Sequence, residues 1–344
     1  MNNPAPARVA VVILNWNGRR FLEKFLTGVE QHTGDYARIV VADNASTDDS
    51  LEYLRKYHPK VVLLPMTENT GFTGGYNRAL AQLDDEYFVL LNSDIEVTPG
   101  WLDPMIRFMD QHPDAGACQP KILDYNRRNR FEYAGASGGF IDRLGYPYCR
   151  GRIFQSIEQD TGQYDDAIPV FWATGACMMV RSSIYKKTGG LDERFFAHME
   201  EIDLCWRIQN LGHSIHVIPS SVIYHVGGGT LPKQNPKKTY LNFRNNLMLL
   251  QKNLPCKEFS KIYRKRIVLD TLAAFSFLFT GGKADCKAVF NAHRDFRRMK
   301  KDEKKEIGEN GLRTGDKRSR FSILFQYHVL KKQRFSQLPH HHLG

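Results

Sequence analysis

The first part of the chain alternates between two kinds of apolar pattern. Residues 8–14, RVAVVIL, form a continuous β-branched run of the kind expected for a strand that is covered on both faces. Apolar residues then recur at helical spacing in residues 18–31. The pattern repeats, with strands expected at 37–42, 61–64 and 86–91 and helices at 46–57 and 74–83. This order favours a parallel sheet with right-handed crossovers.

In a sheet of this kind, ligands bind beyond the carboxyl ends of the strands. Residues 124–165 are polar and rich in Gly, Arg and Tyr, so we expect an insert or loop region that borders the site. Strand character resumes in 170–181, a helix is expected from about Glu200, and short strands are expected at 214–218 and 222–225. The sequence therefore predicts one α/β domain that extends to about residue 240.

The net charge of +11 is unevenly distributed. Residues 241–344 contain 23 Lys and Arg against 9 Asp and Glu, whereas residues 1–240 contain 25 against 28. We therefore divide the chain into a catalytic domain, 1–240, and a basic C-terminal extension, 241–344, with helices expected at 238–253, 258–279 and 284–305. A basic extension indicates an anionic surface nearby, either a membrane or nucleic acid, or else a solvated tail.

The most apolar part of the extension is residues 267–280, IVLDTLAAFSFLFT. This segment is too short to span a bilayer, which needs about 20 residues. Basic residues flank it, so it can lie in the membrane interface or pack as a core helix. The N-terminus lacks a signal-peptide pattern and the six cysteines form no CxxC pair, which favours a cytoplasmic protein with reduced thiols. The inner face of the cell membrane is a further expected location.

Polar side chains follow the expected strands. Asn15, Trp16 and Asn17 follow the first strand, and Asp43 follows the second. A carboxylate here can accept a hydrogen bond from a base or a ribose hydroxyl, or it can cap the next helix. The glycine-rich segment 69–77 is neither a Walker loop nor GxGxxG, but it precedes a helix whose N-terminus favours anions. Its candidate contacts are Asn69, Gly74, Gly75 and Asn77.

Asn92, Ser93 and Asp94 directly follow the fourth expected strand. Mg²⁺ and Mn²⁺ take oxygen ligands and keep several waters, so a carboxylate at a strand end can hold either cation beside a diphosphate. Asp94 is the first candidate ligand, and Glu96 is a second candidate through water. The alternative is that the three residues only form a turn.

An acidic triplet, Glu200, Glu201 and Asp203, begins an expected helix. Glu200 and Asp203 share a face, while Glu201 points about 100° away. Such acids can supply a general base, or they can simply complement the helix dipole. His225 ends an expected strand before three glycines, where it can bind a metal through its imidazole or serve a structural role.

Several segments together resemble the family 2 nucleotide-sugar glycosyltransferases, particularly the rhamnosyltransferase-like branch. The matching segments are VVILNWNG, VADNASTDDS, NTGFTGGYNRAL, LLNSDIEV, TGACMMVRSS, GGLDERFFAHMEEIDLCWRIQNLGHSI and VIYHVGG. The resemblance extends over about residues 8–250. It implies a GT-A fold, a Rossmann-like, mostly parallel sheet flanked by helices, here followed by the basic helical extension. It also implies a metal-dependent, generally inverting hexosyltransferase.

The resemblance also assigns roles to individual residues. It implies that Asn15, Trp16, Asn17 and Asp43 line the nucleotide pocket. It also implies that Gly74, Gly75 and Asn77 lie near the ribose, the phosphates and the sugar. Asp94 matches the metal-binding acid that closes a DxD-like motif, and His225 matches a histidine of the metal shell. Glu201 stands where the family usually has an aspartate base, and Asn92 stands where DxD has its first acid. Glu201 and Asp203 therefore both remain candidates for the base.

The expected activity is transfer of a sugar from a dTDP- or UDP-linked donor, with Mg²⁺ or Mn²⁺, to a glycan or lipid-linked acceptor in cell-surface polysaccharide synthesis. The alternatives are a non-catalytic module that binds nucleotide sugars and a sugar nucleotidyltransferase. The latter would normally carry a glycine-rich loop with basic residues directly after its first strand, where this chain has NWNGRR. Nucleic acid is not an expected partner, because the sequence lacks an RNP-like or finger motif.

Overall fold

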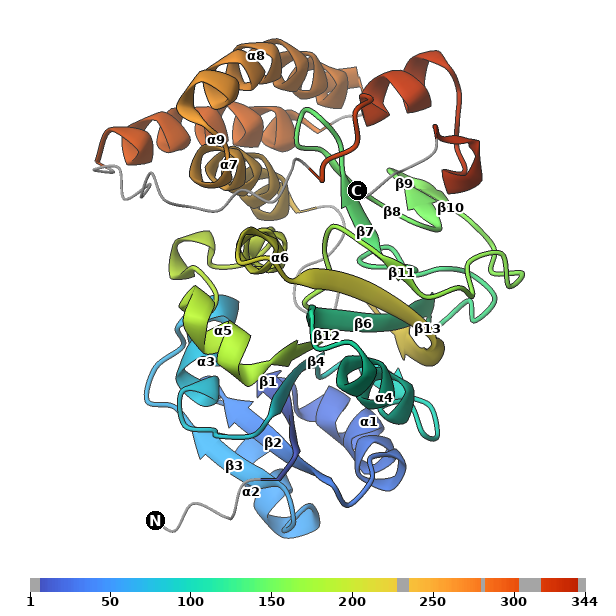
Figure 1. The fold of residues 1–344 in the computed structure, drawn as a ribbon. Helices are drawn as coiled ribbons and strands as arrows, with labels where there is room; N and C mark the ends of the chain where they lie inside the picture. The colour runs from blue at the N-terminus through green and yellow to red at the C-terminus, as the bar shows by residue number, and fades with distance from the viewer. Residues whose placement is uncertain (1–6, 228–234, 280–281, 303–316, 340–344) are drawn as a thin grey trace.

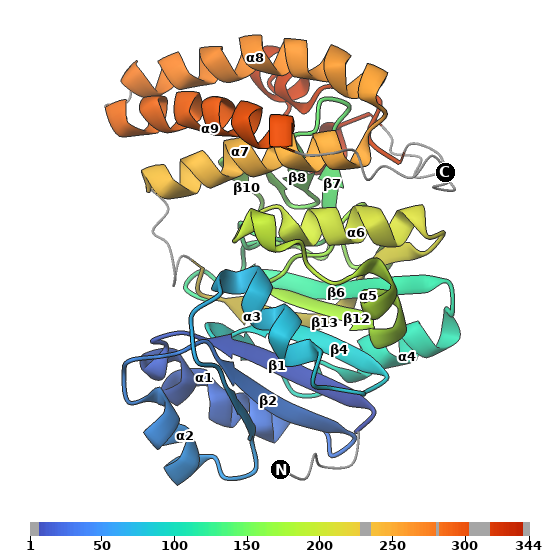
Figure 2. The same cartoon turned by 90° about the vertical axis from the view of Figure 1, so that its left-hand side faces the viewer.

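The computed structural model describes residues 7–227, 235–279, 282–302 and 317–339. Its centre is a nine-stranded sheet with the order β11-β13-β6-β12-β4-β1-β2-β3, in which β5 pairs with β13. Figure 2 shows the layers edge-on, with α1 and α2 on one face of the sheet, α3, α5 and α6 on the other, and α7, α9 and α8 stacked beyond α6. The fold is therefore the predicted α/β sheet with helices on both faces and a C-terminal helical layer.

The first half of the sheet is parallel. Its strands are β1 (Val9–Asn15), β2 (Ala37–Asp43), β3 (Val62–Pro65) and β4 (Tyr87–Asn92). The connecting helices are α1 (Arg19–His32), α2 (Ser50–Tyr57) and α3 (Gly71–Leu80). Residues 9–13 of β1 are buried because helices cover both faces of the sheet, as the apolar run predicts.

The second half of the sheet is mixed. β12 (Cys177–Arg181) runs antiparallel between β4 and β6 (Ala115–Asp124), and β13 (Ser214–His225) runs parallel to β6. β5 (Ile95–Val97) and β11 (Ile168–Pro169) pair antiparallel with β13. The helices of this half are α4 (Asp103–Gln111), α5 (Ser182–Thr188) and α6 (Glu200–Asn210). Residues 214–218 and 222–225, predicted as two strands, form one strand with a register shift between Ile218 and Val222.

Two helix starts differ from the sequence prediction. α2 begins at Ser50 rather than Ser46, because the backbone N–H of Ser46 donates to Asp43 Oδ2 (3.0 Å) within a loop. α3 begins at Gly71 rather than Gly74. The backbone N–H of Gly71 donates to the side-chain oxygen of Asn69, two residues earlier (2.9 Å). Both predicted glycine contacts, Gly74 and Gly75, therefore lie inside a helix.

Residues 124–165, predicted as an insert or loop region, contain a second sheet. Its four antiparallel strands are β7 (Gly139–Ile141), β8 (Pro147–Cys149), β9 (Arg152–Ile153) and β10 (Ser156–Ile157). Residues 317–339 return to cover this sheet and contain the short helices η2 (Phe325–Val329) and η3 (Phe335–Gln337). The Phe335 and Phe140 rings lie 5.1 Å apart, and the Tyr327 and Ser156 hydroxyls lie 2.9 Å apart. The C-terminal segment thus packs on the body of the protein.

Three helices form the outer layer seen in Figure 1: α7 (Pro236–Asn253), α8 (Cys256–Phe279) and α9 (Lys283–Asp302). The expected domain boundary at residue 240 falls inside α7. Among the described residues, no helix is both long and apolar enough to cross a bilayer. All six cysteines are free thiols.

Candidate active site

Three predicted site residues lie side by side where strands of the parallel half end. The strand register pairs Asn15 with Asp43, and Leu14 with Asn92. The Asn15 amide donates to Asp43 Oδ1 (2.8 Å), and its own oxygen is buried without a hydrogen-bond partner. This edge therefore presents a buried acceptor as well as a fixed carboxylate.

Asp43 shapes the loop at this edge. It is fully buried and accepts hydrogen bonds from Asn15 and from the backbone of Ser46, whereas the N-cap of α2 is Asp49. The interpretation of Asp43 as the cap of the next helix is therefore wrong. Asn17 adopts a left-handed backbone (φ 50°) and accepts from the Thr47 N–H (2.7 Å), while Trp16 is 51% exposed. The indole is thus available to a ligand above an ordered loop.

The glycine-rich segment has a packing role that the sequence did not indicate. A Cβ at Gly75 would lie 2.6 Å from Leu14 Cδ1, and one at Gly74 would lie 2.7 Å from Thr70 Cβ. Both positions therefore need glycine for α3 to pack against β1 and its own preceding turn. The Asn77 amide donates to Leu191 O (2.7 Å) and accepts from the Tyr185 hydroxyl (2.7 Å). It joins α3 to the segment before η1 (Glu193–Phe195).

Asp94 and His225, the predicted metal ligands, lie together. The pairing of β5 with β13 places His225 Nε2 3.1 Å from Asp94 Oδ1, and both side chains are buried. Glu132 Oε1 lies 3.4 Å from His225 Nδ1 on the other side of the ring. Burial lowers the pKa of His225, but the charges and hydrogen bonds of Glu132 and Asp94 outweigh it and raise the pKa to about 10.

This pair suits a divalent cation that is shared with a ligand. A carboxylate oxygen and a neutral imidazole nitrogen are donors that Mn²⁺ accepts, so a bound cation would replace the proton that Asp94 and Glu132 stabilise on His225 in its absence. Among the residues that the structure describes, no group of three or more His, Cys, Asp or Glu side chains is placed to hold a metal. Asp94 and His225 would therefore hold the cation only together with oxygens from a diphosphate.

The start of α6 follows a strained loop. Phe196, His198 and Met199 all adopt positive φ (65°, 69° and 74°), although none is glycine. Such strain persists only where the surroundings impose it, and it is common at active sites. The side-chain amide of Asn245 on α7 imposes it here, because it donates to the carbonyls of Phe195 (2.9 Å), Ala197 (2.8 Å) and His198 (2.7 Å).

The three acids of α6 have different surroundings. Asp203 is fully buried and accepts from Arg207 Nε (2.8 Å), Lys252 Nζ (2.8 Å) and Asn253 Nδ2 (2.9 Å). Glu200 and Glu201 each have a buried carboxylate oxygen with no hydrogen-bond partner. Burial raises the pKa of Glu201 to about 7, and burial together with the Glu201 charge raises the pKa of Glu200 well above its usual range.

Sequence reasoning missed two residues of this region, Glu132 and Arg152, because both lie in the segment expected to be loop. Arg152 is only 7% exposed and its Nε has no hydrogen-bond partner. The other guanidinium nitrogens contact only Cys149 Sγ (3.3 Å) and Phe154 O (3.4 Å), and the Tyr133 ring lies 4.4 Å from the guanidinium carbon. A buried cation with such weak acceptors is suited to an anionic ligand.

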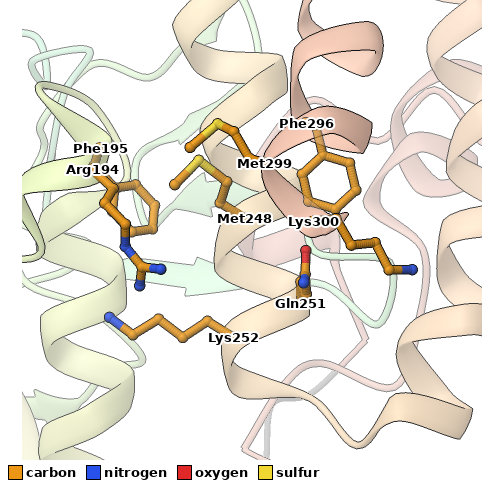
Figure 3. Close-up of a pocket in the computed structure, with 8 residues that line it drawn as sticks. All are labelled: Arg194, Phe195, Met248, Gln251, Lys252, Phe296, Met299 and Lys300. Atoms are coloured by element: carbon orange, nitrogen blue, oxygen red, sulfur yellow. The ribbon is translucent and has the colours of Figure 1, made fainter. Parts of the chain in front are cut away.

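A small cavity of about 10 Å³ lies between η1, α7 and α9 (Figure 3). Its lining residues are Arg194, Phe195, Met248, Gln251, Lys252, Phe296, Met299 and Lys300. None of them is a predicted site residue. A cavity of this size holds about one water molecule, so it is a packing gap rather than a substrate pocket.

The chain is similar to known proteins in both sequence and fold. The family model described as Glycosyl transferase family 2 matches residues 10–189, just over half of the chain. The N-acetylglucosaminyl-diphospho-decaprenol L-rhamnosyltransferase of Mycobacterium tuberculosis is 30% identical over 233 residues, which cover 62% of this chain and 75% of that protein.

Solved structures share the fold at low sequence identity. TarS of S. aureus in complex with UDP-GlcNAc matches with a TM-score of 0.57 and 15% identity, over 84% of this chain and 80% of that one. The mannosyltransferase PcManGT of Pyrobaculum calidifontis, in complex with GDP-Man and Mn²⁺, matches with a TM-score of 0.52 and 16% identity, over 85% and 76%. The chain therefore belongs to glycosyl transferase family 2, and it is a GT-A glycosyltransferase of the rhamnosyltransferase-like branch.

Proposed function

We propose that the protein is a metal-dependent, inverting glycosyltransferase that uses a dTDP- or UDP-linked sugar, with L-rhamnose the first candidate. The acceptor is a hydroxyl of a glycan or a lipid-linked intermediate in cell-surface polysaccharide synthesis. The observation that carries the proposal is Glu201, a half-buried residue whose carboxylate has one buried oxygen without a hydrogen-bond partner and whose pKa is raised to about 7. The name of the M. tuberculosis relative supports both the sugar and the lipid-linked acceptor.

Glu201 is the better candidate for the general base. A base must be able to accept a proton near neutral pH and must reach the acceptor hydroxyl. Asp203 already accepts hydrogen bonds from Arg207, Lys252 and Asn253, so both of its carboxylate oxygens are occupied within the fold. Burial and the charge of Glu201 raise the pKa of Glu200 as well, which favours the neutral form of Glu200 beside an ionised Glu201.

The donor lies along the carboxyl edge of the parallel strands. The unpartnered oxygen of Asn15 and the carboxylate of Asp43 recognise the base, and the exposed Trp16 indole stacks on the nucleoside. Asn17, Asn69 and Asn92 complete the edge. Asp94 and His225 hold Mg²⁺ or Mn²⁺, which neutralises charge on the leaving diphosphate when it is bound. Arg152 supplies a second, fixed positive charge for phosphate oxygens.

The chemical step needs no covalent intermediate. The acceptor hydroxyl gives its proton to Glu201, and its oxygen attacks the anomeric carbon from the face opposite the diphosphate. The bond between that carbon and the diphosphate oxygen breaks at the same time, so the configuration inverts. The strained loop before α6 fixes Glu201 for this task.

The first experiment is a thermal-shift series with dTDP, UDP and GDP, each with Mn²⁺ and with EDTA, followed by transfer assays with the matching sugar donors. We expect one nucleotide to stabilise the protein in a metal-dependent way and its donor to be turned over. Stabilisation without transfer to any glycan or lipid-linked acceptor would favour the non-catalytic module. Consumption of a nucleoside triphosphate and a sugar phosphate would favour the nucleotidyltransferase.

A lipid-linked acceptor also requires access to a bilayer. We therefore place the protein at the inner face of the cell membrane, where the basic helical layer would meet anionic lipids.

A further inference from the structure

Helix α8 buries two charged side chains and, from its middle onward, exposes large apolar ones. Its charged residues Arg266 and Asp270 are 1% and 0% exposed, whereas Leu272 is 61% exposed. Further along, Phe275 is 49% and Phe279 89% exposed. A helix on the surface of a soluble protein normally does the opposite, with its apolar face toward the core. The outer face of α8 is therefore suited to an apolar environment.

A buried polar network fixes this orientation. Arg266 Nε donates to Asp270 Oδ1 (3.0 Å), and Asp270 also accepts from the Tyr146 hydroxyl (2.9 Å) and lies 3.0 Å from His293 Nε2. Arg266 donates further to the carbonyl of Leu144 (3.2 Å). Rolling α8 to bury its apolar face would break this network and leave buried charges unpaired. The apolar exposure is thus built into the fold.

The exposed residues form one continuous surface, which we call the α8 face. Its members recur at helical spacing along α8, and one more comes from α9: Lys261, Arg264, Lys265, Val268, Leu272, Phe275, Phe279 and Phe290. The Phe275 and Phe290 rings lie 6.2 Å apart, so the face continues onto α9. Figure 2 shows α8 as the outermost layer of the molecule.

The charge on this face has a single sign. The basic residues 261, 264 and 265 are all exposed at its N-terminal end. The acidic residues of α8 are Glu258 and Asp270, and each is paired with an arginine, Arg318 and Arg266 respectively. The α8 face therefore combines cations at one end with apolar side chains at the other and has no acid of its own.

We propose that the α8 face binds the surface of an anionic lipid bilayer. Leu272, Phe275 and Phe279 enter the boundary between headgroups and acyl chains, and the three cations contact lipid phosphates. A second copy of the chain is a poorer occupant, because the face offers no acid to pair with the cations of its partner. The α8 face is thus the surface through which the protein would reach the membrane location given under the proposed function, whichever sugar is transferred.

The test is sedimentation of the full chain with vesicles of phosphatidylcholine, with and without phosphatidylglycerol. We expect binding that needs phosphatidylglycerol and weakens with salt. Combining Lys261→Glu, Arg264→Glu and Lys265→Glu should weaken binding at least ~100-fold, since each cation near such a surface contributes roughly fivefold and the new acids repel it. Combining Val268→Ser, Leu272→Ser and Phe275→Ser should weaken binding at least ~10-fold.

Matched control variants alter the same kinds of residue elsewhere. Val329→Ser with Leu330→Ser removes apolar side chains that are 60% and 47% exposed on η2 and its C-cap. Arg55→Glu with Lys56→Glu and Lys60→Glu reverses three exposed charges at and just after α2. Both controls should bind vesicles like the unaltered chain. In addition, the fluorescence of Phe275→Trp should shift to the blue when phosphatidylglycerol vesicles are added.

Three outcomes would overturn the inference: no binding to phosphatidylglycerol vesicles, equal loss in the control variants, or a dimer that the triple serine variant turns into a monomer. The last would assign the α8 face to a second copy of the chain. Because the readout is lipid binding, sugar transfer in solution can succeed when this test fails, and the reverse also holds.

Discussion

Three acids at the start of one helix show how far the surroundings of a residue determine its role. Asp203 accepts hydrogen bonds from three donors, which occupy both of its carboxylate oxygens, whereas one carboxylate oxygen of Glu201 is buried without a hydrogen-bond partner. The spacing of these acids in the sequence is compatible with either as the base. Their partners on α7, some 50 residues later, distinguish them, and no local pattern reveals those partners.

The first prediction concerns Glu201→Gln. This change keeps the size of the side chain but removes the proton acceptor, so we expect transfer to fall at least ~100-fold. Nucleotide binding, measured by calorimetry with Mn²⁺, should stay the same. Glu201→Asp is the matched control, because it retains a carboxylate and should keep part of the activity. Full turnover by Glu201→Gln would move the role of base to another residue.

The pH dependence follows from the same residue. Burial raises the pKa of Glu201 to about 7, and a general base works only when it is deprotonated. We therefore expect kcat/KM to rise about tenfold per pH unit below the pKa and to level off above it. A buffer series with saturating metal measures this profile. A flat profile between about pH 5.5 and 8 would contradict the assignment.

At the scale of elements, the loop before α6 depends on α7. A single side chain, Asn245, satisfies three carbonyls of a loop that contains three left-handed non-glycine residues. This contact joins the acids of the site to a helix that the sequence placed mostly in a separate extension. α7 therefore acts as a positioning element for the site, whatever the domain division at residue 240 proves to be.

Asn245→Ala should remove the side-chain contact between α7 and the loop before α6. The carbonyls of Ala197 and His198 lose their donor, while that of Phe195 keeps Arg244, so we expect the free energy of unfolding to fall by about 2 kcal/mol and kcat to fall as Glu201 loses its fixed position. Asn235→Ala is the matched control on the same helix. It removes only the N-cap bond to Lys237, which costs about 1 kcal/mol, and should leave kcat unchanged. Equal kcat in both variants would contradict the positioning role.

How well each element could be predicted depends on how local its causes are. β1, α1, β2 and the start of α6 have apolar or acidic patterns that need no distant partner, and the structure confirms them within about a residue or two. α3 begins three residues before its predicted start, because glycines before a helix resemble a turn, whereas Leu14 and Thr70 leave room only for glycine inside this helix. The buried side of α8 depends on Tyr146 and His293, which are distant in sequence.

At the scale of the whole molecule, the candidate metal site joins two halves of the sheet. Asp94 follows β4 in the parallel half, and His225 ends β13 in the mixed half. The sequence predicted both candidate ligands, first from their positions at strand ends and then from a resemblance to known enzymes. It could not predict Glu132 or Arg152, because a polar segment without periodicity gives no sign of the second sheet that places them.

Replacing either candidate ligand should therefore abolish the same effect, which is the metal-dependent stabilisation of the protein by nucleotide. For Asp94→Ala and for His225→Ala, we expect the Mn²⁺-dependent gain in thermal stability with the preferred nucleotide to disappear. We expect a smaller shift to remain in EDTA, because the edge of the sheet that carries Asn15 and Asp43 is intact. Differential scanning fluorimetry with and without Mn²⁺ measures both. A metal-dependent shift that survives in both variants would exclude these two residues as the ligands.

The dependence of the active-site loop on Asn245 also sets an order of events during synthesis. Domains form as the chain leaves the ribosome, N-terminal parts first. The last strand of the central sheet ends at His225, so the sheet can pair while α7 is still inside the exit tunnel. The loop before Glu200 gains its donor only when Asn245 emerges. We therefore expect a nascent chain whose central sheet has already formed to gain a fixed position for Glu201 only after α7 is released.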